Sequence, residues 1–402
     1  TKNNNGNTVW DCVWFGSYPQ AEVVPSGEYT ALNKSLIQKG DIIASDTIYG
    51  KLQKATGWNV NGDINIDGNK YKRIKKSDAT ETYDEPGINR YNWFDSNTYH
   101  YFKYQPIKWR VLNVDGNVAF LLADKGLDGQ KYNILYTSVT WETSTIRSWL
   151  NGYGATYNKC GTDYSSKNFI STAFSTLEQL AIKDTTVIDY NSKNMETKVG
   201  DNTNDKIFLL SEPEVYTNTA TSYGFDPYSS TDDKARVSNC STYAKAMGVS
   251  PSYYLGGNYS DSDYWGKYNW WLRSPGDNTA DASEVGPYGR AHRYSSRVDY
   301  NNAVRPALHL NLSSSNFYSY AGMVCSDGTV NEEGGEVIIE IPTEEAIKPQ
   351  DNKSTIESSE TTKSSAVYPE STAKENVSAK KVSGFKVKNT KGKKAKLTWK
   401  KL

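Results

Sequence analysis

The stretch that decides the fold reads NWWLRSPGDNTADASEVGPYGRAHRYSSRVDYNNAVRPALHLNL, residues 269–312. Both of its ends, 269–275 and 303–312, are apolar and aromatic, and apolar residues there alternate with polar ones. Alternation of this kind is typical of strands that bury one face. We therefore expect two core strands on either side of a long polar segment. The residues expected in the core of the second strand are Val304, Leu308 and Leu310.

Each of these strands carries one arginine, Arg273 and Arg305, near its loop end. A guanidinium in an apolar strand needs hydrogen-bond acceptors, so we expect both arginines to pair with backbone carbonyls or a carboxylate and to hold the loop ends together. With Trp270 and Trp271, they are assigned as structural support.

The enclosed segment 276–302 has hardly any apolar periodicity and is dense in Tyr, Ser, Arg, Asn, Asp and Gly. Antibody paratopes have this composition, because Tyr supplies rigid amphipathic area while Ser, Gly and Asn adapt. The segment is predicted to be an exposed recognition surface; a polar loop without a ligand is the alternative. The candidate ligand-binding residues are Asp281, Ser283, Tyr288, Arg290, His292, Arg293, Tyr294, Ser296, Arg297, Asp299 and Tyr300.

The residue set of 276–302 is also skewed. Glu284 is the only member there of the group Lys, Gln, Glu, Met and Trp. These five residues cannot be reached from an AAC codon by changing the adenines at its first two positions. This pattern suggests the hypothesis that the segment is built to vary.

The totals exclude several classes of function. Lys plus Arg and Asp plus Glu both number 46, so no overall field favours nucleic acid or an anionic membrane. No apolar run approaches the ~18 residues of a membrane helix, so no membrane insertion is expected in this segment. The first residue is Thr1, as if a leader had been removed, and we expect an extracellular protein. The 30 Tyr and 11 Trp predict an aromatic-rich core.

Signals for a metal or a catalytic centre are weak. The sequence D-x-N-x-D-G at 63–68 opens like a calcium loop, but Ile74 occupies the twelfth position, where a carboxylate is needed. No metal site or cofactor is predicted, although calcium bound by scattered loop oxygens stays open. None of the three histidines lies in a catalytic motif, and His309 is expected to face away from the core between Leu308 and Leu310. The four cysteines show no CxxC pairing, which leaves free thiols or a disulfide open.

Turn and capping signals place several elements. Asp67-Gly68 and Asp115-Gly116 lie between apolar runs and predict two β-hairpins. Ser175 with Glu178, and Ser211 with Glu214, form S-x-x-E capping boxes that predict two helix starts. Two further short helices are expected to end at Gly152 and Gly248.

Three regions follow from composition. Residues 1–341 are predicted to form one α+β domain with an N-terminal β-hairpin elaboration over about 1–100. Residues 342–380 are rich in Ser, Thr, Lys and Glu and are expected to be a disordered linker. Residues 381–402 predict two strands, the second cut short, and resemble the start of a fibronectin type III module, a truncated β-sandwich.

Several motifs together resemble a large domain family of unknown function from surface proteins of Gram-positive bacteria. Its C-terminal half is similar to the C-type-lectin-like fold of formylglycine-generating, sulfatase-modifying enzymes, where a strand ends near a G/A-[FV]-R motif; Ala303-Val304-Arg305 takes that place here. The enzyme's paired active cysteines have no counterpart in this sequence. The motifs are WFGSYPQ (14–20), YFKYQPIKWRVLNVDGN (101–117), WETSTIRSWLNG (141–152), DKIFLLSEPEVY (205–216), STYAKAMGV (241–249), WWLRSPG (270–276) and VRPALHLNL (304–312).

The same fold is used by the variable proteins of diversity-generating retroelements, which rewrite codons just before a fixed C-terminal strand, and 276–302 has that location. The resemblance and the composition together predict a non-enzymatic adhesin or receptor-like protein that binds a protein or glycan on another cell or host surface. The alternatives are a carbohydrate-active or sulfatase-modifying enzyme and a structural cell-wall spacer.

Overall fold

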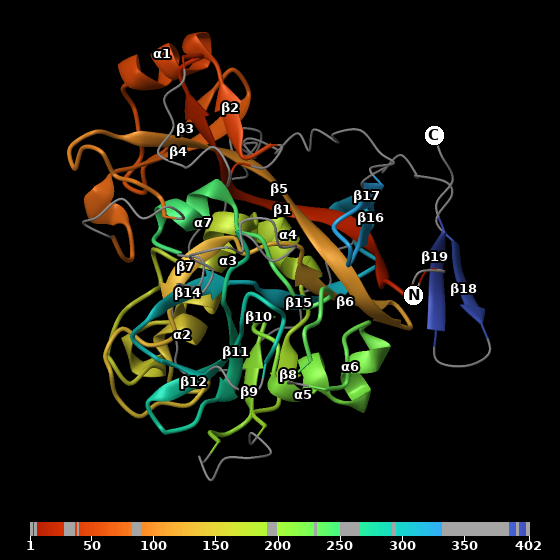
Figure 1. Ribbon diagram of the computed structural model, residues 1–402. Helices are drawn as coiled ribbons and strands as arrows, with labels where there is room; N and C mark the ends of the chain where they lie inside the picture. Colours follow the sequence, from red (N-terminus) through yellow and green to blue (C-terminus); the bar gives the residue numbers. More distant parts are fainter. Residues whose placement is uncertain are drawn as a thin grey trace, which may run out of the picture.

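The computed structural model describes residues 3, 6–27, 37, 40–82, 90–190, 199–228, 231–249, 266–291 and 295–331, and the backbone of 386–390 and 394–398. The described part is a mixed α/β structure that consists mostly of sheets, with short helices around them (Figure 1). This agrees with the predicted α+β class. Among the described residues, no helix is both long and apolar enough to cross a membrane.

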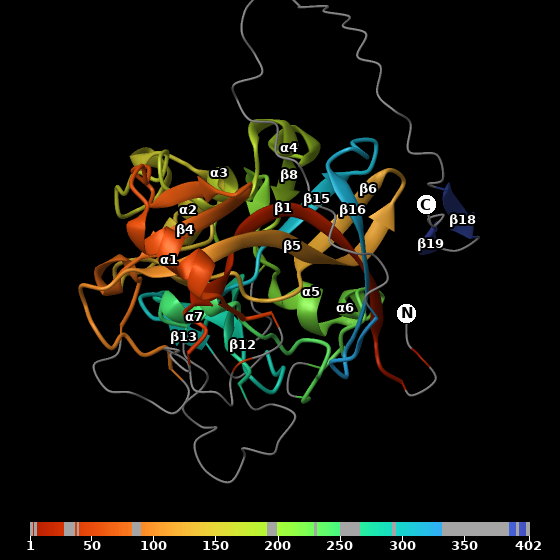
Figure 2. The same ribbon diagram turned by 90° about the horizontal axis from the view of Figure 1, so that it is seen from above.

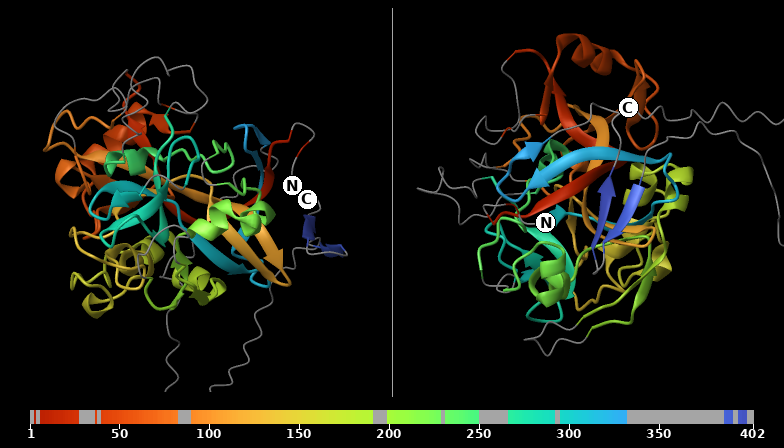
Figure 3. Two further views of the ribbon diagram at one scale, coloured as in Figure 1. Left: turned by 60° about the horizontal axis from the view of Figure 1, so that its bottom comes forward. Right: turned by 90° about the vertical axis from the view of Figure 1, so that its right-hand side faces the viewer.

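The large sheet has the strand order β10-β15-β6-β5-β1-β16-β17 and is mostly antiparallel. Its longest members, β1 and β5, run side by side across the middle of the molecule (Figure 2). On the other side of β1 lies β16 (Figure 3, right). The strands are β1 (Val9–Val24), β5 (His100–Asp115), β6 (Val118–Ala123), β10 (Ile207–Phe208), β15 (Ala307–Asn311), β16 (Tyr318–Cys325) and β17 (Val330–Asn331).

The position of β1 corrects one prediction. Residues 1–100 were expected to be an N-terminal elaboration, but β1 pairs with both β5 and β16 and so lies inside the large sheet. The elaboration is limited to the elements after β1, which pack around a small core of Val23, Leu52, Tyr71 and Tyr101. These elements are β2 (Ile42–Ala44), α1 (Asp46–Lys54), β3 (Asp63–Ile66) and β4 (Asn69–Ile74).

Both predicted hairpins are confirmed, with different turns. Asp67 and Gly68 connect β3 to β4, and both have positive φ, 51° and 74°, as a type I′ turn requires. In the β5–β6 hairpin Asp115 pairs with Val118, so Gly116 and Asn117 form the turn. Only Gly116 of these two has a positive φ, which suits glycine at the first position of a type II′ turn.

A second, five-stranded sheet has the order β13-β12-β11-β14-β7 and lies below β1 and β5 in the view of Figure 1. It contains the predicted strand 269–275 and most of the polar segment. Strand β15 of the large sheet follows directly after β14, so the chain crosses between the sheets at Arg305 and Pro306. The strands are β7 (Asp128–Lys131), β11 (Trp270–Pro275), β12 (Asp281–Val285), β13 (Ser295–Arg297) and β14 (Asn301–Val304).

The capping predictions are confirmed. Ser175 and Ser211 each form a reciprocal capping box with the glutamate three residues later. Gly152 takes the left-handed conformation at the end of α2, and Gly248 follows α7 with φ 99°. The helices are α2 (Thr145–Asn151), α3 (Phe169–Ala173), α4 (Thr176–Ala181), α5 (Glu212–Tyr216), α6 (Asn218–Ser222) and α7 (Thr242–Ala246).

The remaining elements are the 3-10 helices η2 (Lys76–Asp78) and η3 (Ala155–Tyr157) and two antiparallel strand pairs. One is formed by β8 (Thr185–Val187) and β9 (Thr203–Asp205). The other, β18 (Lys386–Thr390) with β19 (Lys394–Thr398), contains the two strands predicted for 381–402, whereas the predicted linker at 342–380 lies outside the described residues. All four cysteines are free thiols.

Candidate functional site

The frame of the candidate site is strand β11, whose two tryptophans are fully buried. Trp270 Nε1 donates to the carbonyl of Arg236 at 3.0 Å, and Trp271 Nε1 donates to the carbonyl of Gln130 at 2.9 Å. Buried indoles need such partners, because an unsatisfied N–H is costly away from water. The tryptophans therefore fasten β11 to its neighbours.

The two strand arginines lie in the frame and are buried, at 2% and 0% exposure. Arg273 Nη1 and Nη2 donate to the Glu214 carboxylate at 2.6 and 3.2 Å, and Nη1 also reaches the carbonyl of Leu209. Arg305 Nε donates to the carbonyl of Ala123 at 2.7 Å, and its guanidinium lies 5.0 Å from the Trp270 ring centroid. These are the kinds of partner expected from the sequence.

The predicted binding residue Ser283 is not available to a ligand. Its side chain is buried, at 2% exposure, and the hydroxyl oxygen lies 2.5 Å from Glu212 Oε1 and 2.7 Å from the carbonyl oxygen of Pro275, so these two acceptors share its one proton. The assignment of Ser283 as a contact residue is therefore wrong, because β12 turns this side chain into the domain. Asp281, at the start of the same strand, is half-buried and accepts from Asn278 Nδ2 at 2.6 Å.

A buried carboxylate, Glu284, lies on β12 in the five-stranded sheet. Oε1 accepts from Asn269 Nδ2 at 2.9 Å, and Oε2 accepts from Ser296 Oγ at 2.9 Å and from Asn302 Nδ2. Glu284 is 2% exposed, and burial raises its pKa to about 7. The carboxylate therefore joins β12 to β13, to β14 and to the residue before β11, using neutral donors alone among the described residues.

Ser296 is thus half-buried and turned towards Glu284, while the next residue, Arg297, is exposed. Arg297 forms a fork with Asp299: Nε lies 3.0 Å from Oδ1 and Nη2 lies 2.9 Å from Oδ2. Its guanidinium carbon lies 4.0 Å from the ring centroid of Tyr136 and 5.2 Å from that of Tyr300. Both tyrosines are 51% exposed. We call Tyr136, Arg297, Asp299 and Tyr300 the Tyr–Arg surface.

The loop that carries Tyr136 follows β7 and reaches this surface through backbone contacts. Asn133 N–H donates to the carbonyl of Val298 at 2.8 Å, and Val139 N–H donates to the carbonyl of Thr279 at 3.0 Å. The same loop exposes Ile134 and Leu135, at 41% and 58%. Exposed apolar residues next to polar ones mark interaction surfaces when they are contiguous.

A second pair of predicted residues lies on the turn between β12 and β13. Arg290 pairs with Asp232, and its guanidinium carbon lies 5.8 Å from the Tyr288 ring centroid. The carbonyl of Tyr288 accepts from Asp233 N–H, which fastens the turn to the 231–236 loop. The predicted residues His292, Arg293 and Tyr294 lie outside the described residues.

Tyr136 and the role of Glu284 were missed from the sequence. Tyr136 lies far from 276–302 in the chain, and nothing in its own neighbourhood marks it as a contact residue. Glu284 stood out as the one exception to the residue set of the segment. Its burial explains that exception, because it serves the frame.

The D-x-N-x-D-G sequence serves the elaboration hairpin. The Asp63 carboxylate accepts from Tyr104 at 2.8 Å and from Lys72 at 3.3 Å, and Asp67 pairs with Lys51 at the surface. The described residues contain no group of three or more His, Cys, Asp or Glu side chains placed to hold a metal ion.

Comparison with protein families gives one match. Residues 116–312 are similar to a family described as a domain of unknown function (DUF6273). The matched region runs from the β5–β6 turn to the end of β15 and includes both the frame and the Tyr–Arg surface. Neither the curated proteins nor the solved structures contain a match.

Proposed function

We propose that the protein is a non-enzymatic, extracellular ligand-binding protein of the adhesin or receptor type, with a C-type-lectin-like arrangement around β11 to β15. The Tyr–Arg surface is the proposed contact area for a protein or glycan on another cell or host surface. The observation that carries the proposal is the position of Arg297 between two half-exposed tyrosines.

The composition and the support of this surface favour binding. Tyr and Arg are enriched at the centres of interfaces, because each combines a large contact area with hydrogen-bonding groups. Here the Asp299 fork and the two rings hold Arg297 in one orientation, so less conformational entropy is lost when a ligand binds. The frame below is fastened by buried hydrogen bonds of Trp270, Trp271 and Glu284.

A glycan and protein array tests the proposal. The wild type is compared with a Tyr136→Ala/Tyr300→Ala variant and with Phe94→Ala, a matched control because Phe94 is an aromatic residue of the N-terminal region with 58% exposure. The proposal expects ligands that the wild type and the Phe94 variant bind at least tenfold better than the double variant. Equal binding by all three proteins, or no bound ligand at all, would contradict it.

We further propose that the segment 276–302 is diversified at its exposed positions. Arg290, Arg297 and Tyr300 would then vary, whereas Ser283 and Ser296 would be retained because they bond to buried carboxylates. Sequencing of the gene and its surroundings tests this proposal. Codons at the exposed positions that do not mostly end in C or T, or the absence of a nearby adenine-bearing near-copy, would refute it.

A further inference from the structure

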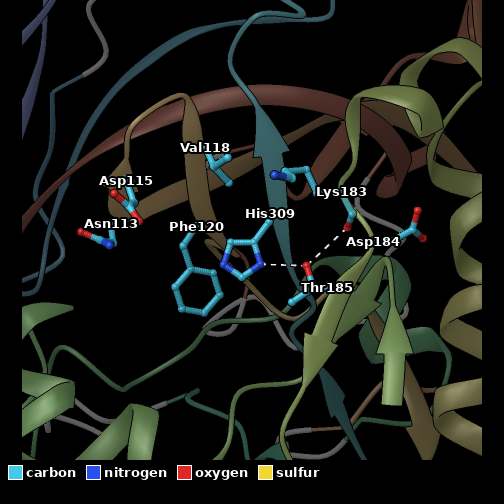
Figure 4. A pocket seen from close by; sticks show the side chains of 8 residues that line it. All are labelled: Asn113, Asp115, Val118, Phe120, Lys183, Asp184, Thr185 and His309. Atoms are coloured by element: carbon cyan, nitrogen blue, oxygen red, sulfur yellow. Dashed lines mark hydrogen bonds between the residues drawn. The ribbon is translucent and has the colours of Figure 1, made fainter. Parts of the chain in front are cut away.

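A cavity of about 300 Å³ opens on the large sheet (Figure 4). It is separate from the Tyr–Arg surface, which lies at the five-stranded sheet. This volume is at the lower end of the range for small-molecule sites, so it suits a ligand of few atoms. Its lining residues are Asn113, Asp115, Val118, Phe120, Lys183, Asp184, Thr185 and His309.

The pairing of three strands brings the floor together. Asn113 on β5 lies opposite Phe120 on β6, and Phe120 lies opposite His309 on β15. Directly paired residues share a face, so these three side chains form one row across the sheet. The His309 and Phe120 rings stack with centroids 4.8 Å apart. The floor therefore combines an apolar ring with an imidazole.

Thr185 places a hydrogen-bonding group beside this imidazole. Its hydroxyl oxygen lies 3.3 Å from the carbonyl of Lys183, to which it can donate its one proton, and 2.9 Å from His309 Nδ1. In the tautomer that suits this arrangement, the hydroxyl accepts from His309 Nδ1–H. His309 Nε2 then carries the lone pair, and Figure 4 shows this nitrogen on the side of Phe120 and Asn113. Burial lowers the pKa of His309 and favours its neutral form. The ring thus offers a hydrogen-bond acceptor to the cavity.

The walls carry opposite charges that do not pair with each other. The Lys183 backbone bonds to β15 at His309, and Asp115 ends β5, so β15 and β6 lie between them. Figure 4 shows the Lys183 amino group pointing back over β15 towards Val118. Within the described part of the chain, neither the Lys183 ammonium nor the Asp115 carboxylate has an ion-pair partner, whereas Asp184 pairs with Lys206 at 3.4 Å.

This pattern selects a ligand by charge. An anion would be attracted by Lys183 but repelled by Asp115. A cation would be attracted by Asp115 but repelled by Lys183. A ligand with both charges satisfies both walls, because each forms a charge-assisted hydrogen bond of about 2.8 Å with the opposite group. An apolar part of the same ligand can then contact Val118 and Phe120.

We propose that this cavity binds a free α-amino acid with an apolar side chain. Lys183 binds the carboxylate, Asp115 and His309 Nε2 accept hydrogen bonds from the ammonium group, and Val118 and Phe120 contact the side chain. The site does not depend on the function proposed for the Tyr–Arg surface.

Calorimetry on the full chain tests the proposal, with the twenty standard amino acids as probes and L-leucine as reference. Two analogues each lack one charge: 4-methylpentanoate lacks the ammonium group and 3-methylbutylamine lacks the carboxylate. We expect apolar amino acids to bind, and each analogue to bind at least tenfold more weakly than L-leucine. Absence of binding by all twenty, or equal binding of the analogues, would overturn the proposal.

Two variants test which residue binds each charged group of the ligand. Lys183→Met should remove the preference for L-leucine over 3-methylbutylamine, and Asp115→Asn should remove the preference over 4-methylpentanoate. The matched controls are Lys51→Met and Asp67→Asn, which alter an exposed Lys–Asp pair outside the cavity and should leave binding unchanged. If the two wall variants retained the wild-type preferences, the assignment of these residues would be wrong, and the analogue series on the wild type would still decide whether an amino acid binds.

Discussion

The Arg297 guanidinium carbon lies 4.0 Å from the centroid of the Tyr136 ring, although the two residues come from different halves of the chain. The contact forms because Asn133 N–H donates to the carbonyl of Val298 and so places the loop after β7 against the strand end after β13. The proposed recognition surface is therefore composite: the segment 276–302 supplies the guanidinium and one ring, and a distant loop supplies the other ring.

This contact should be measurable as a coupling energy. In a double-mutant cycle with Tyr136→Ala and Arg297→Ala, we expect a coupling of about 0.5–1 kcal/mol in the free energy of unfolding, as for exposed cation–π pairs. Urea denaturation of the four proteins gives this value. A parallel cycle with Phe94→Ala and Arg297→Ala should be additive, and additivity in both cycles would show that the Tyr136 contact adds no stability.

Glu284 predicts a pH dependence of stability. Its pKa is raised to about 7 in the fold, from an ordinary value near 4.5, so the folded protein holds this proton more tightly than the unfolded chain. The group therefore destabilises the fold progressively as the pH rises from about 4.5 through 7, by an amount on the order of 3 kcal/mol at pH 8. Below pH 4.5 both states are protonated and the effect disappears.

The variant Glu284→Gln isolates this contribution. The glutamine keeps the shape of the side chain, and its NH₂ can bond to Asn269 Oδ1, which is buried without a partner among the described residues, once that amide flips. Urea denaturation at pH 5 and pH 8 should show that the loss of stability between these pH values is smaller for Glu284→Gln than for the wild type. An exposed control, Asp67→Asn, should leave the loss unchanged, and equal losses in all three proteins would contradict the prediction.

The two capping boxes form a matched pair. Glu214 caps α5 and also pairs with buried Arg273, whereas Glu178 caps α4 without an arginine. Glu214→Gln leaves a buried guanidinium without its counter-charge and should cost about 3–5 kcal/mol of unfolding free energy. Glu178→Gln preserves the capping pattern and should cost under about 1 kcal/mol. Equal losses by thermal or urea denaturation would show that the Arg273 pair contributes little.

Within 276–302, tolerance to substitution should follow burial. Ser283→Tyr forces a ring into a site that is 2% exposed and breaks the bond to Glu212, so we expect little soluble protein. Tyr300→Ser alters a side chain that is 51% exposed and should shift the free energy of unfolding by under about 0.5 kcal/mol. Yield and melting temperature of the two variants check this expectation. If both variants gave a similar yield and melting temperature, burial would not determine which positions of 276–302 tolerate substitution.

The sequence was informative where local chemistry determines structure. Asp67-Gly68, the Ser175 and Ser211 boxes and the glycine after α2 all lie where their side chains or backbone angles require, because each involves residues a few positions apart. The prediction for His309 is confirmed only in part: Leu308 and Leu310 are buried and His309 lies on the opposite face, but that face is not turned away from the core, because the His309 ring stacks with buried Phe120.

Long-range pairing was not predictable in the same way. Nothing in the local pattern of residues 9–24 indicates that β1 pairs with β16, and so these residues were assigned to an elaboration. Strand β12 is covered on both faces, since Ala282, Ser283 and Glu284 are all buried, and the polar sequence of this strand gives no sign of that burial. Ser283 was therefore taken as exposed, although it packs against Glu212. Tyr136 was missed because its neighbour Arg297 is distant in the chain.

The place of β1 also affects how the molecule can be divided. The region 116–312, which is similar to a domain family of unknown function, omits β1, the whole of β5, and β16, although these strands form the middle of the large sheet. A fragment cut at those limits would leave β6 with an unpaired edge and would expose core residues that pack against β1 and β5, a combination that favours aggregation. Because β1 pairs with β16, a ribosome must deliver the chain beyond Cys325 before this pairing can form, so the middle of the large sheet is completed only after all of residues 9–325 have been synthesised.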